Sequence, residues 1–330
     1  MVPRPFPHRK PSLEARAAMG ASALALGTKV ECTPRHREIH EAMGAISRAT
    51  GHRYVKLLAS GDCAIMSLVA ALEGPILVPD QGGWKGFRAY ADIFGLRVET
   101  LRTELGAIDP EGLQEAFSRV RPEAFFITSF AGYMAEQPMR EIGKVCREEG
   151  VLLVEDASGA IGDERLADGR YSDAIVCSTG PQEIISVVSG GFVSTDRKEL
   201  LGSAPEVATA CKISPVTCAG IVEELKGAGR RVEALVRCSD ILKEEVPDAI
   251  HRGKRGICVG LGLEDPRRFA ETAKERGLVT DMGYTFLTTC PRYERFLGPG
   301  VVVELKRLEV LEMGEERVLE MAGILKECMD

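Results

Sequence analysis

Polar residues suited to binding a charged ligand gather in three short segments of the sequence. Each segment combines small residues with an acid or a hydroxyl, and each lies at the end of an expected strand or the start of an expected helix. The segments are SGDCA at 60–64, VEDASGA at 154–160 and CSTGPQEIISVVSGG at 177–191. Ligands of parallel α/β sheets bind at the carboxyl ends of the strands. The three segments are therefore candidates for one site.

The first segment opens an expected helix over residues 61–72. A turn of small residues at a helix N-terminus presents free backbone N–H groups and the positive end of the helix dipole, which together make a cradle for phosphate. Gly61, Asp62 and Cys63 are the candidate residues of this cradle. A plain helix cap with Asp62 in the first turn explains the same residues equally well.

The other two segments supply two acids and a hydroxyl. Asp156 follows the expected strand at 151–155, where it is placed to hold a protonated ring nitrogen. An ordinary cap between strand and loop is the alternative. Ser178 and Glu183 follow the expected strand at 174–177, and a simple loop between strands is the alternative there.

Strand and helix patterns alternate along the chain up to about residue 200. Short, unalternating apolar strands spaced by amphipathic helices predict a largely parallel sheet covered on both faces, which is an α/β fold. The strands are expected at 76–78, 96–100, 124–128, 151–155, 174–177 and 191–194. The helices are expected at 13–26, 35–50, 61–72, 86–94, 110–118 and 138–149.

Beyond residue 200 the pattern becomes helical and then changes to a compact α+β unit. This part is expected to contain a helix at 223–242, strands at 256–261, 278–281 and 301–305, and helices at 266–276 and 315–328. We predict three parts of the chain: an N-terminal arm over 1–30, a large domain over 31–244 and a small C-terminal domain over 245–330.

Composition limits the classes of partner. The chain has 330 residues, 45% of them hydrophobic, and a net charge of -7, which argues against nucleic acid and against an anionic membrane surface. No apolar run approaches the ~18–20 residues that span a membrane, and no apolar segment typical of a signal peptide follows the basic N-terminus. The ten cysteines include no C-x-x-C pair and are expected to be thiols. We therefore expect a cytoplasmic protein.

In their order and separation, the three segments resemble the large domain of fold-type-I pyridoxal-phosphate enzymes. They are most similar to the DegT/StrS-like (DegT/DnrJ/EryC1/StrS) sugar aminotransferase family. The family's SGTA turn, EDAAQAxGA strand end and Ser-x-x-x-x-Lys segment before Gly-Gly read here as SGDCA, EDASGAIGD and STGPQE…SGG. The stretches FAETAKERGLVTD and LEVLEMGEERVLEMAGIL resemble the family's small domain and last helix. The resemblance covers about residues 40–330.

The resemblance implies a role for each matching residue. Asp156 matches the aspartate under the pyridine nitrogen, and Ser178 matches the serine that binds the phosphate. Gly61, with Asp62 and Cys63 beside it, matches the phosphate turn. The resemblance further implies a small-molecule substrate and a homodimer.

Trp84 is the only tryptophan of the chain. It lies near the position at which the family stacks an aromatic side chain on the cofactor ring. A role in the core or on the surface is the alternative for this residue.

Two positions depart from the family. Glu183 stands where the family has its Schiff-base lysine, and Asp62 stands where a threonine hydroxyl would meet the phosphate. A carboxylate cannot form an imine, although burial can raise its pKa and make it a general base. An aspartate carboxylate that faces a phosphate dianion is repelled by it, and the repulsion is strong when water is excluded from between them. Lys85 and Lys212 do not lie at the expected strand end, so neither is expected to replace the lysine.

Three interpretations stay open. In the first, the protein is a family enzyme that acts on sugar or small amine and keto substrates, holds pyridoxal or pyridoxamine phosphate non-covalently, and uses Glu183 as a proton shuttle. It would then be a transferase or a lysine-independent, dehydratase-like enzyme. In the second, it is a catalytically silent homologue that serves as a subunit or scaffold for an active paralogue. In both, the protein lacks the Schiff-base lysine, so ordinary transamination is doubtful.

In the third interpretation the acidic pocket binds a metal ion or a cationic ligand. A separate cluster, Cys32, His36 and His40, has two histidines one helical turn apart, as metal ligands can be. Histidines that are solvated or locally hydrogen-bonded are the alternative there.

Overall fold

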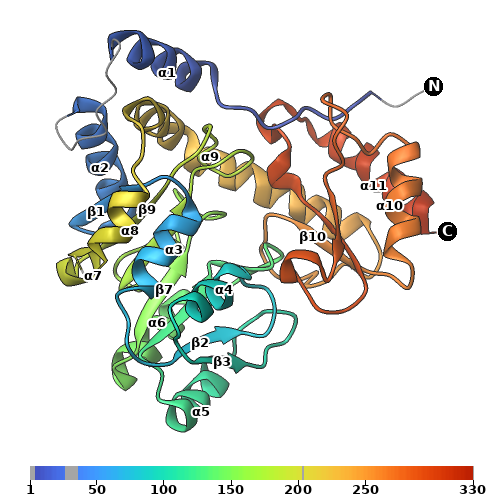
Figure 1. The fold of residues 1–330 in the computed structure, drawn as a ribbon. Coiled ribbons are helices and arrows are strands. Elements are labelled where there is room, and N and C mark those ends of the chain that lie inside the picture. Colours follow the sequence, from blue (N-terminus) through green and yellow to red (C-terminus); the bar gives the residue numbers. More distant parts are fainter. Residues whose placement is uncertain (1–3, 27–35, 203, 330) are drawn as a thin grey trace.

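A large sheet and a smaller sheet organise the molecule, which is a computed structural model that describes residues 4–26, 36–202 and 204–329. The large sheet has seven strands (Figure 1). In spatial order they are β1 (Tyr54–Leu58), β9 (Gly191–Thr195), β8 (Ala174–Ser178), β7 (Leu152–Asp156), β4 (Ala124–Thr128), β2 (Ile76–Pro79) and β3 (Val98–Leu101). The pairs from β8 to β3 are parallel, whereas β9 pairs antiparallel with both β8 and β1. The predicted α/β fold with a mostly parallel sheet is confirmed.

Helices cover both faces of this sheet. The helices described up to residue 245 are α1 (Leu13–Ala25), α2 (Arg37–Thr50), α3 (Gly61–Val69), α4 (Gly86–Ile93), α5 (Pro110–Val120), α6 (Met139–Glu149), α7 (Lys198–Gly202), α8 (Pro205–Ala210) and α9 (Pro215–Glu245). α2 is capped at its C-terminus by Gly51, which takes the left-handed conformation with φ 78°. The predicted start of this helix, residue 35, lies outside the described residues.

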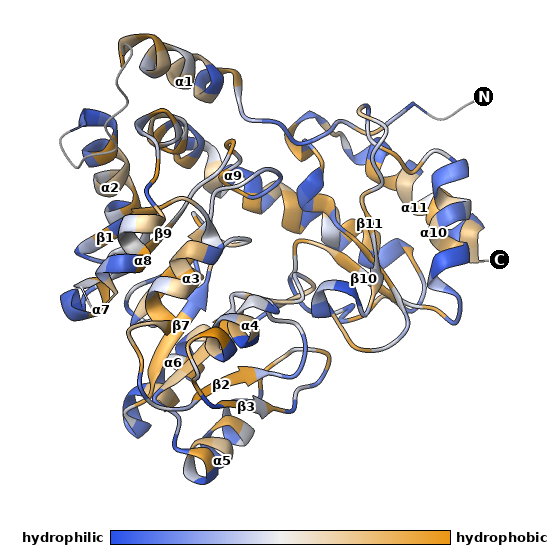
Figure 2. Cartoon of the chain, viewed as in Figure 1, coloured by the Kyte–Doolittle hydropathy of each residue, from blue (hydrophilic) through white to orange (hydrophobic). Residues whose placement is uncertain are grey.

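The sheet separates two hydrophobic cores, and alternate residues of each strand face opposite cores. In β4, Ala124 and Phe126 pack in one core with α3 and α4. Phe125 and Ile127 pack in the other core with α2, α5, α6 and α9. Burial on both faces explains why these strands read as continuous apolar runs (Figure 2 shows β2 and β7 in hydrophobic colours).

The smaller sheet is antiparallel, in the order β10 (Val259–Gly262), β12 (Gly300–Val303) and β11 (Leu287–Cys290). It is accompanied by α10 (Pro266–Glu275), α11 (Glu315–Met329) and the short turns η1 (Arg292–Glu294), η2 (Leu305–Arg307) and η3 (Val310–Glu312). A two-stranded ribbon, β5 (Phe130–Ala131) and β6 (Ala135–Glu136), follows β4. The division of the chain at residue 244 stays a prediction.

One expected strand was wrong, and one strand was missed. Residues 278–281 form only isolated bridges, to Phe6 and to Thr285, and do not join the small sheet, which consists of β10, β12 and β11. β1 was not predicted, since YVKLL is short and contains a lysine. It forms the antiparallel edge of the large sheet. β1 matters to the site because it ends two residues before Ser60.

The N-terminal residues connect the two sheet regions. Phe6 and His8 pair with Thr280 and Leu308 of the C-terminal part. From there the chain continues to α1, which packs on α9 (Figure 1). α9 itself also contacts α11, so this long helix touches both regions.

Candidate functional site

The three sequence segments meet at one cavity of about 240 Å³. Its lining residues are Ser60, Gly61, Asp62, Ile65, Trp84, Tyr133, Asp156, Ser158, Val176, Cys177, Ser178, Glu183, Arg295 and Lys306. Every predicted site residue lines it except Cys63, whose side chain packs against the core between the large sheet and α3. A larger cleft, of about 570 Å³, lies beside the N-terminal arm and holds none of the predicted site residues.

The turn before α3 and the end of β8 are pressed together. Ser60 caps α3, with its Oγ accepting from Cys63 N at 3.1 Å. A Cβ on Gly61 would lie 2.7 Å from Ser178 Cβ, so only glycine allows this approach. A Cβ on Gly191 would lie 2.5 Å from Gly61 N. The two glycines thus bring a helix N-terminus and a serine hydroxyl to one place.

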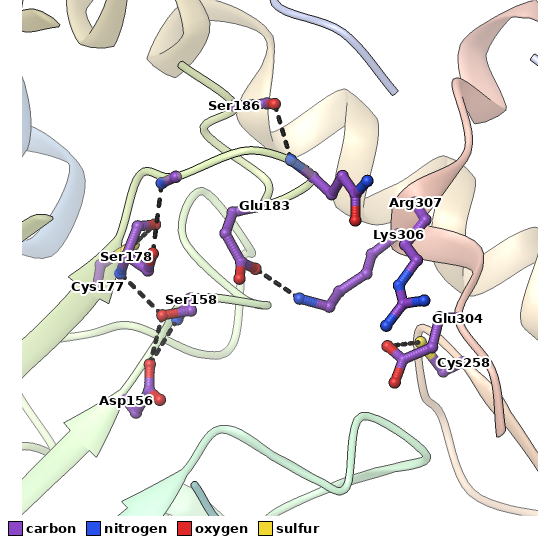
Figure 3. Close-up of polar contacts among 12 residues, drawn as sticks. Asp156, Ser158, Cys177, Ser178, Glu183, Ser186, Cys258, Glu304, Lys306 and Arg307 are labelled. Atoms are coloured by element: carbon purple, nitrogen blue, oxygen red, sulfur yellow. Dashed lines mark hydrogen bonds and ion pairs between the residues drawn. The ribbon is translucent and has the colours of Figure 1, made fainter. Parts of the chain in front are cut away.

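Ser178 and Asp156 are tied to each other through Ser158 (Figure 3). Ser158 donates to Asp156 Oδ1 through its hydroxyl, at 2.6 Å, and through its backbone N, at 3.0 Å. Its Oγ accepts from Ser178 N at 2.8 Å. Two neighbouring strand ends, β7 and β8, are held in register by this small network.

Asp156 is a buried acid with one uncommitted oxygen. Among the described residues no hydrogen bond reaches Oδ2, while Oδ1 takes both bonds from Ser158. Burial raises the pKa of the Asp156 carboxyl, and the hydrogen bonds from Ser158 oppose this shift. A cation or a charged N–H donor in the cavity would therefore relieve the cost of burying this charge.

Asp62 is turned toward aromatic side chains of the wall. Trp84 Nε1 donates to Asp62 Oδ1 at 2.9 Å. Burial raises the pKa of Tyr90 to about 12, with the charge of Asp62 and a hydrogen bond to its carboxylate adding to the shift. Trp84 itself stacks on Tyr293, with ring centroids 6.1 Å apart and an interplanar angle of 26°.

Glu183 faces a lysine that the sequence analysis missed. Lys306 Nζ lies 2.7 Å from Glu183 Oε2 and 4.6 Å from the centroid of the Tyr133 ring. Lys306 belongs to η2, which follows β12 of the small sheet. It is 123 residues from Glu183 in the chain. The only local signal was a lysine just after an apolar strand, in GVVVELK at 300–306.

Burial and the opposite charges of Glu183 and Lys306 act against each other on the pKa values of both groups. Burial raises the pKa of Glu183, and the adjacent Lys306 ammonium opposes the shift. Burial acts to lower the pKa of Lys306, but the combined attraction to Glu183, Tyr133 and Glu304 outweighs it, so the pKa is raised. Lys85 and Lys212, the two lysines weighed from sequence, are exposed and do not line the cavity.

A second buried ion pair supports the same side of the cavity. Arg295 Nε lies 2.9 Å from Glu304 Oε1. The guanidinium of Arg295 also lies over the Tyr133 ring, 4.3 Å from its centroid. Burial acts to raise the pKa of Glu304, but the charges of Arg295, Lys306 and Arg307, with the hydrogen bond from Arg295, together lower it to about 2. Tyr133 and Tyr293 both have positive φ, 67° and 60°, a strained conformation that proteins tend to keep at functional sites.

Within the described residues, no three histidine, cysteine, aspartate or glutamate side chains lie together so that they could bind a metal ion. The metal-binding interpretation therefore has no support from this part of the chain. Cys32, one member of the cluster considered from sequence, lies outside those residues. Also within the described chain, no helix is both long and apolar enough to cross a membrane.

Comparison with known proteins bears on the family. Residues 101–210 match the DegT/DnrJ/EryC1/StrS aminotransferase family, which confirms the recognised family over that part of the chain. Residues 230–326 match the MJ1341 family C-terminal domain. The chain is 30% identical over 132 residues to (S)-ureidoglycine–glyoxylate transaminase of Bacillus subtilis. That match spans 38% of this chain and 31% of that enzyme, so the chain covers under a third of that relative's length.

Solved structures of other proteins superpose on nearly the whole chain. Serine palmitoyltransferase of Sphingomonas wittichii superposes with a TM-score of 0.77 at 14% identity, over 96% of this chain and 83% of that one. A Helicobacter pylori aminotransferase involved in the biosynthesis of pseudoaminic acid superposes with a TM-score of 0.75 at 14% identity, over 99% of both chains. The fold is that of the fold-type-I pyridoxal-phosphate enzymes. At these identities the structural likeness concerns the fold alone.

Proposed function

We propose that the cavity binds pyridoxal phosphate or pyridoxamine phosphate, and that the protein transfers amino groups on a small molecule of the sugar, amine or keto class. The observation that carries this proposal is the meeting of Asp156, Ser178 and Gly61 around one cavity. The fold and the aminotransferase-family match over residues 101–210 support it.

Asp156 fits the ring end of this cofactor. Burial raises the pKa of the Asp156 carboxyl, and its Oδ2 accepts no hydrogen bond from the described residues. A protonated ring nitrogen could donate a hydrogen bond to Oδ2 and balance the negative charge of the carboxylate. The cofactor, when bound, supplies an electron sink for breaking a bond at the substrate carbon. Asp156 would keep the proton on that nitrogen, and Ser158 would keep Asp156 in place.

The residues near Gly61 fit the phosphate end in part. The Ser178 hydroxyl accepts from Gly180 N at 3.3 Å and can still donate its own hydrogen to a phosphate oxygen. Asp62 accepts from Trp84 and cannot donate as the family's threonine does. Phosphate binding would therefore depend on Ser178 and on the N-terminal end of α3.

A titration of the purified protein with each cofactor form tests this function. We expect both forms to raise the unfolding temperature, and Ser178→Ala to weaken the effect, since it removes one phosphate donor. Ser118→Ala is the matched control, because Ser118 lies on the exposed face of α5. Absence of any thermal shift with either form at millimolar cofactor would reject the proposal. Molar mass by light scattering would test the expected homodimer in the same samples.

The silent-subunit interpretation has one observation in its favour, the carboxylate at position 183. It predicts that the protein alone shows no amino-group transfer and gains none with the cofactor, while a lysine-bearing paralogue becomes more active when the two are mixed. Assays of each protein alone and of the mixture separate this interpretation from the proposed function.

A further inference from the structure

Lys306 occupies a place in the cavity that the proposed function does not use. Its side chain is 8% exposed and its Nζ lies 2.7 Å from Glu183 Oε2. Figure 3 shows it reaching from the η2 side across the cavity toward Glu183, with Ser158 and Asp156 beyond. Removing an ammonium group from water costs several kcal/mol of free energy, which the pairing with Glu183 offsets. The position of this buried pair inside the cavity suggests a functional role.

We propose that Lys306 attaches the pyridoxal phosphate covalently, in place of a lysine at position 183, and that Glu183 is the counter-ion of the imine. This inference rests on the proposed function. A lysine side chain is only one bond longer than a glutamate side chain. The amine of a lysine at 183 would therefore end near the space that Lys306 Nζ occupies beside the Glu183 carboxylate. The amine is thus supplied from the opposite wall.

The chemical step balances without any further reactant. The ammonium of Lys306 first passes a proton to the Glu183 carboxylate, and the free amine attacks the aldehyde carbon of the cofactor. The C=O bond breaks and a C=N bond forms, and the carbonyl oxygen leaves as water. Glu183 returns its proton during this loss of water. In sum, an ammonium and an aldehyde give a protonated imine and one water, with no change in oxidation state.

The charge at the site is the same before and after this step. The ammonium and the protonated imine each carry one positive charge, so the Glu183 carboxylate is paired both before and after the step. The other groups around Lys306 are Tyr133, Arg295, Glu304 and Asp156. Glu304 is already paired with Arg295 at 2.9 Å, which leaves Glu183 as the partner of Lys306.

A structural ion pair that joins the two walls is the competing explanation. It would need the charges of Lys306 and Glu183 but not the chemistry of a primary amine. Lys306→Arg separates the two, because arginine keeps the charge and a hydrogen bond to Glu183 but does not form a stable imine with an aldehyde.

The first measurement is to map the attachment site in the native protein. The protein is incubated with pyridoxal phosphate, reduced with borohydride, digested and analysed by mass spectrometry. We expect the phosphopyridoxyl label on Lys306, together with an imine absorption band before reduction. Pyridoxamine phosphate, which has no aldehyde, should bind without giving label or band.

The variants sharpen the result. Lys306→Arg should lose the band and the label, and should bind pyridoxal phosphate on the order of tenfold more weakly, about 1.4 kcal/mol, with little change for pyridoxamine phosphate. Lys212→Arg is the control, since Lys212 is exposed outside the cavity. Glu183→Gln should keep the label but lower the pH at which the imine band titrates, because the counter-ion is gone.

The outcomes are distinct. A native protein that binds the cofactor but carries no label on Lys306 overturns this inference and leaves the proposed function standing, with the pair as a structural one. A native protein that binds neither cofactor form overturns both. Label on Lys306 that disappears in Lys306→Arg, with pyridoxamine phosphate binding retained, supports the inference.

Discussion

The two walls of the cavity differ in origin and in charge. One wall comes from the strand ends of the large sheet and from the segments after them, and it carries the acids Asp62, Asp156 and Glu183. The other comes from the C-terminal part of the chain and carries the cations Arg295 and Lys306. We call the first, with Asp62, Asp156 and Glu183, the motif wall, and the second, with Arg295 and Lys306, the C-terminal wall. The motif wall alone is a poor guide to the chemistry, because the C-terminal wall supplies the charges that balance it.

The largest effect is expected on the C-terminal wall. Glu304→Gln would leave Arg295 buried without its partner, and we expect a loss of about 3 kcal/mol in the free energy of unfolding, measured by urea denaturation. Glu245→Gln is the matched control, because Glu245 and Lys326 pair on the surface, where both side chains are 42% exposed. If both variants are equally stable, the buried pair does not support this wall.

The same pair predicts a pH dependence. The pKa of Glu304 is about 2 in the folded chain against an ordinary value of 4.5, so the unfolded chain binds this proton more readily. The stabilisation by Glu304 is therefore full above 4.5 and is lost as the pH falls toward 2. The difference in unfolding free energy between the native protein and Glu304→Gln should shrink over this window. A difference that stays constant with pH would contradict the assignment.

On the motif wall, the largest loss of stability should come from adding a side-chain atom at the close contact between Gly61 and Ser178. The added Cβ of Gly61→Ala would lie 2.7 Å from Ser178 Cβ, and such overpacking costs about 2 kcal/mol. Gly227→Ala, in open space on α9, should instead be neutral or stabilising by up to about 1 kcal/mol. Equal melting temperatures for the two variants would show that the turn and β8 can move apart freely.

Asp156→Asn should have the smallest effect on folding and a measurable one on binding. It keeps the shape of the side chain but removes the charge that would face a protonated ring nitrogen. We expect the affinity for both cofactor forms to fall on the order of tenfold, measured by isothermal titration calorimetry. Asp92→Asn, on the exposed side of α4, is the control. Unchanged affinity would place the ring elsewhere.

Much of the large sheet and of the motif wall could be predicted from the sequence. The strands at 76–78, 124–128 and 174–177 are apolar runs buried on both faces, and this pattern is a local property of the chain. Parallel strands bring their carboxyl ends to one edge, so Asp156 and Ser178 could be expected to meet. The strand expected at 278–281 failed because only pairing partners decide whether a short apolar stretch joins a sheet.

The sequence by itself determined the α/β fold and the segments that form the motif wall, because hydrophobic periodicity and turn residues act over a few neighbouring positions. Only the tertiary structure decided what faces that wall. Lys306 is 123 residues from Glu183, and Asp62 meets Trp84 across 22 residues. Such contacts depend on how the small sheet and α4 pack against the large sheet. No local pattern encodes that packing, since it follows from the shape of the whole core.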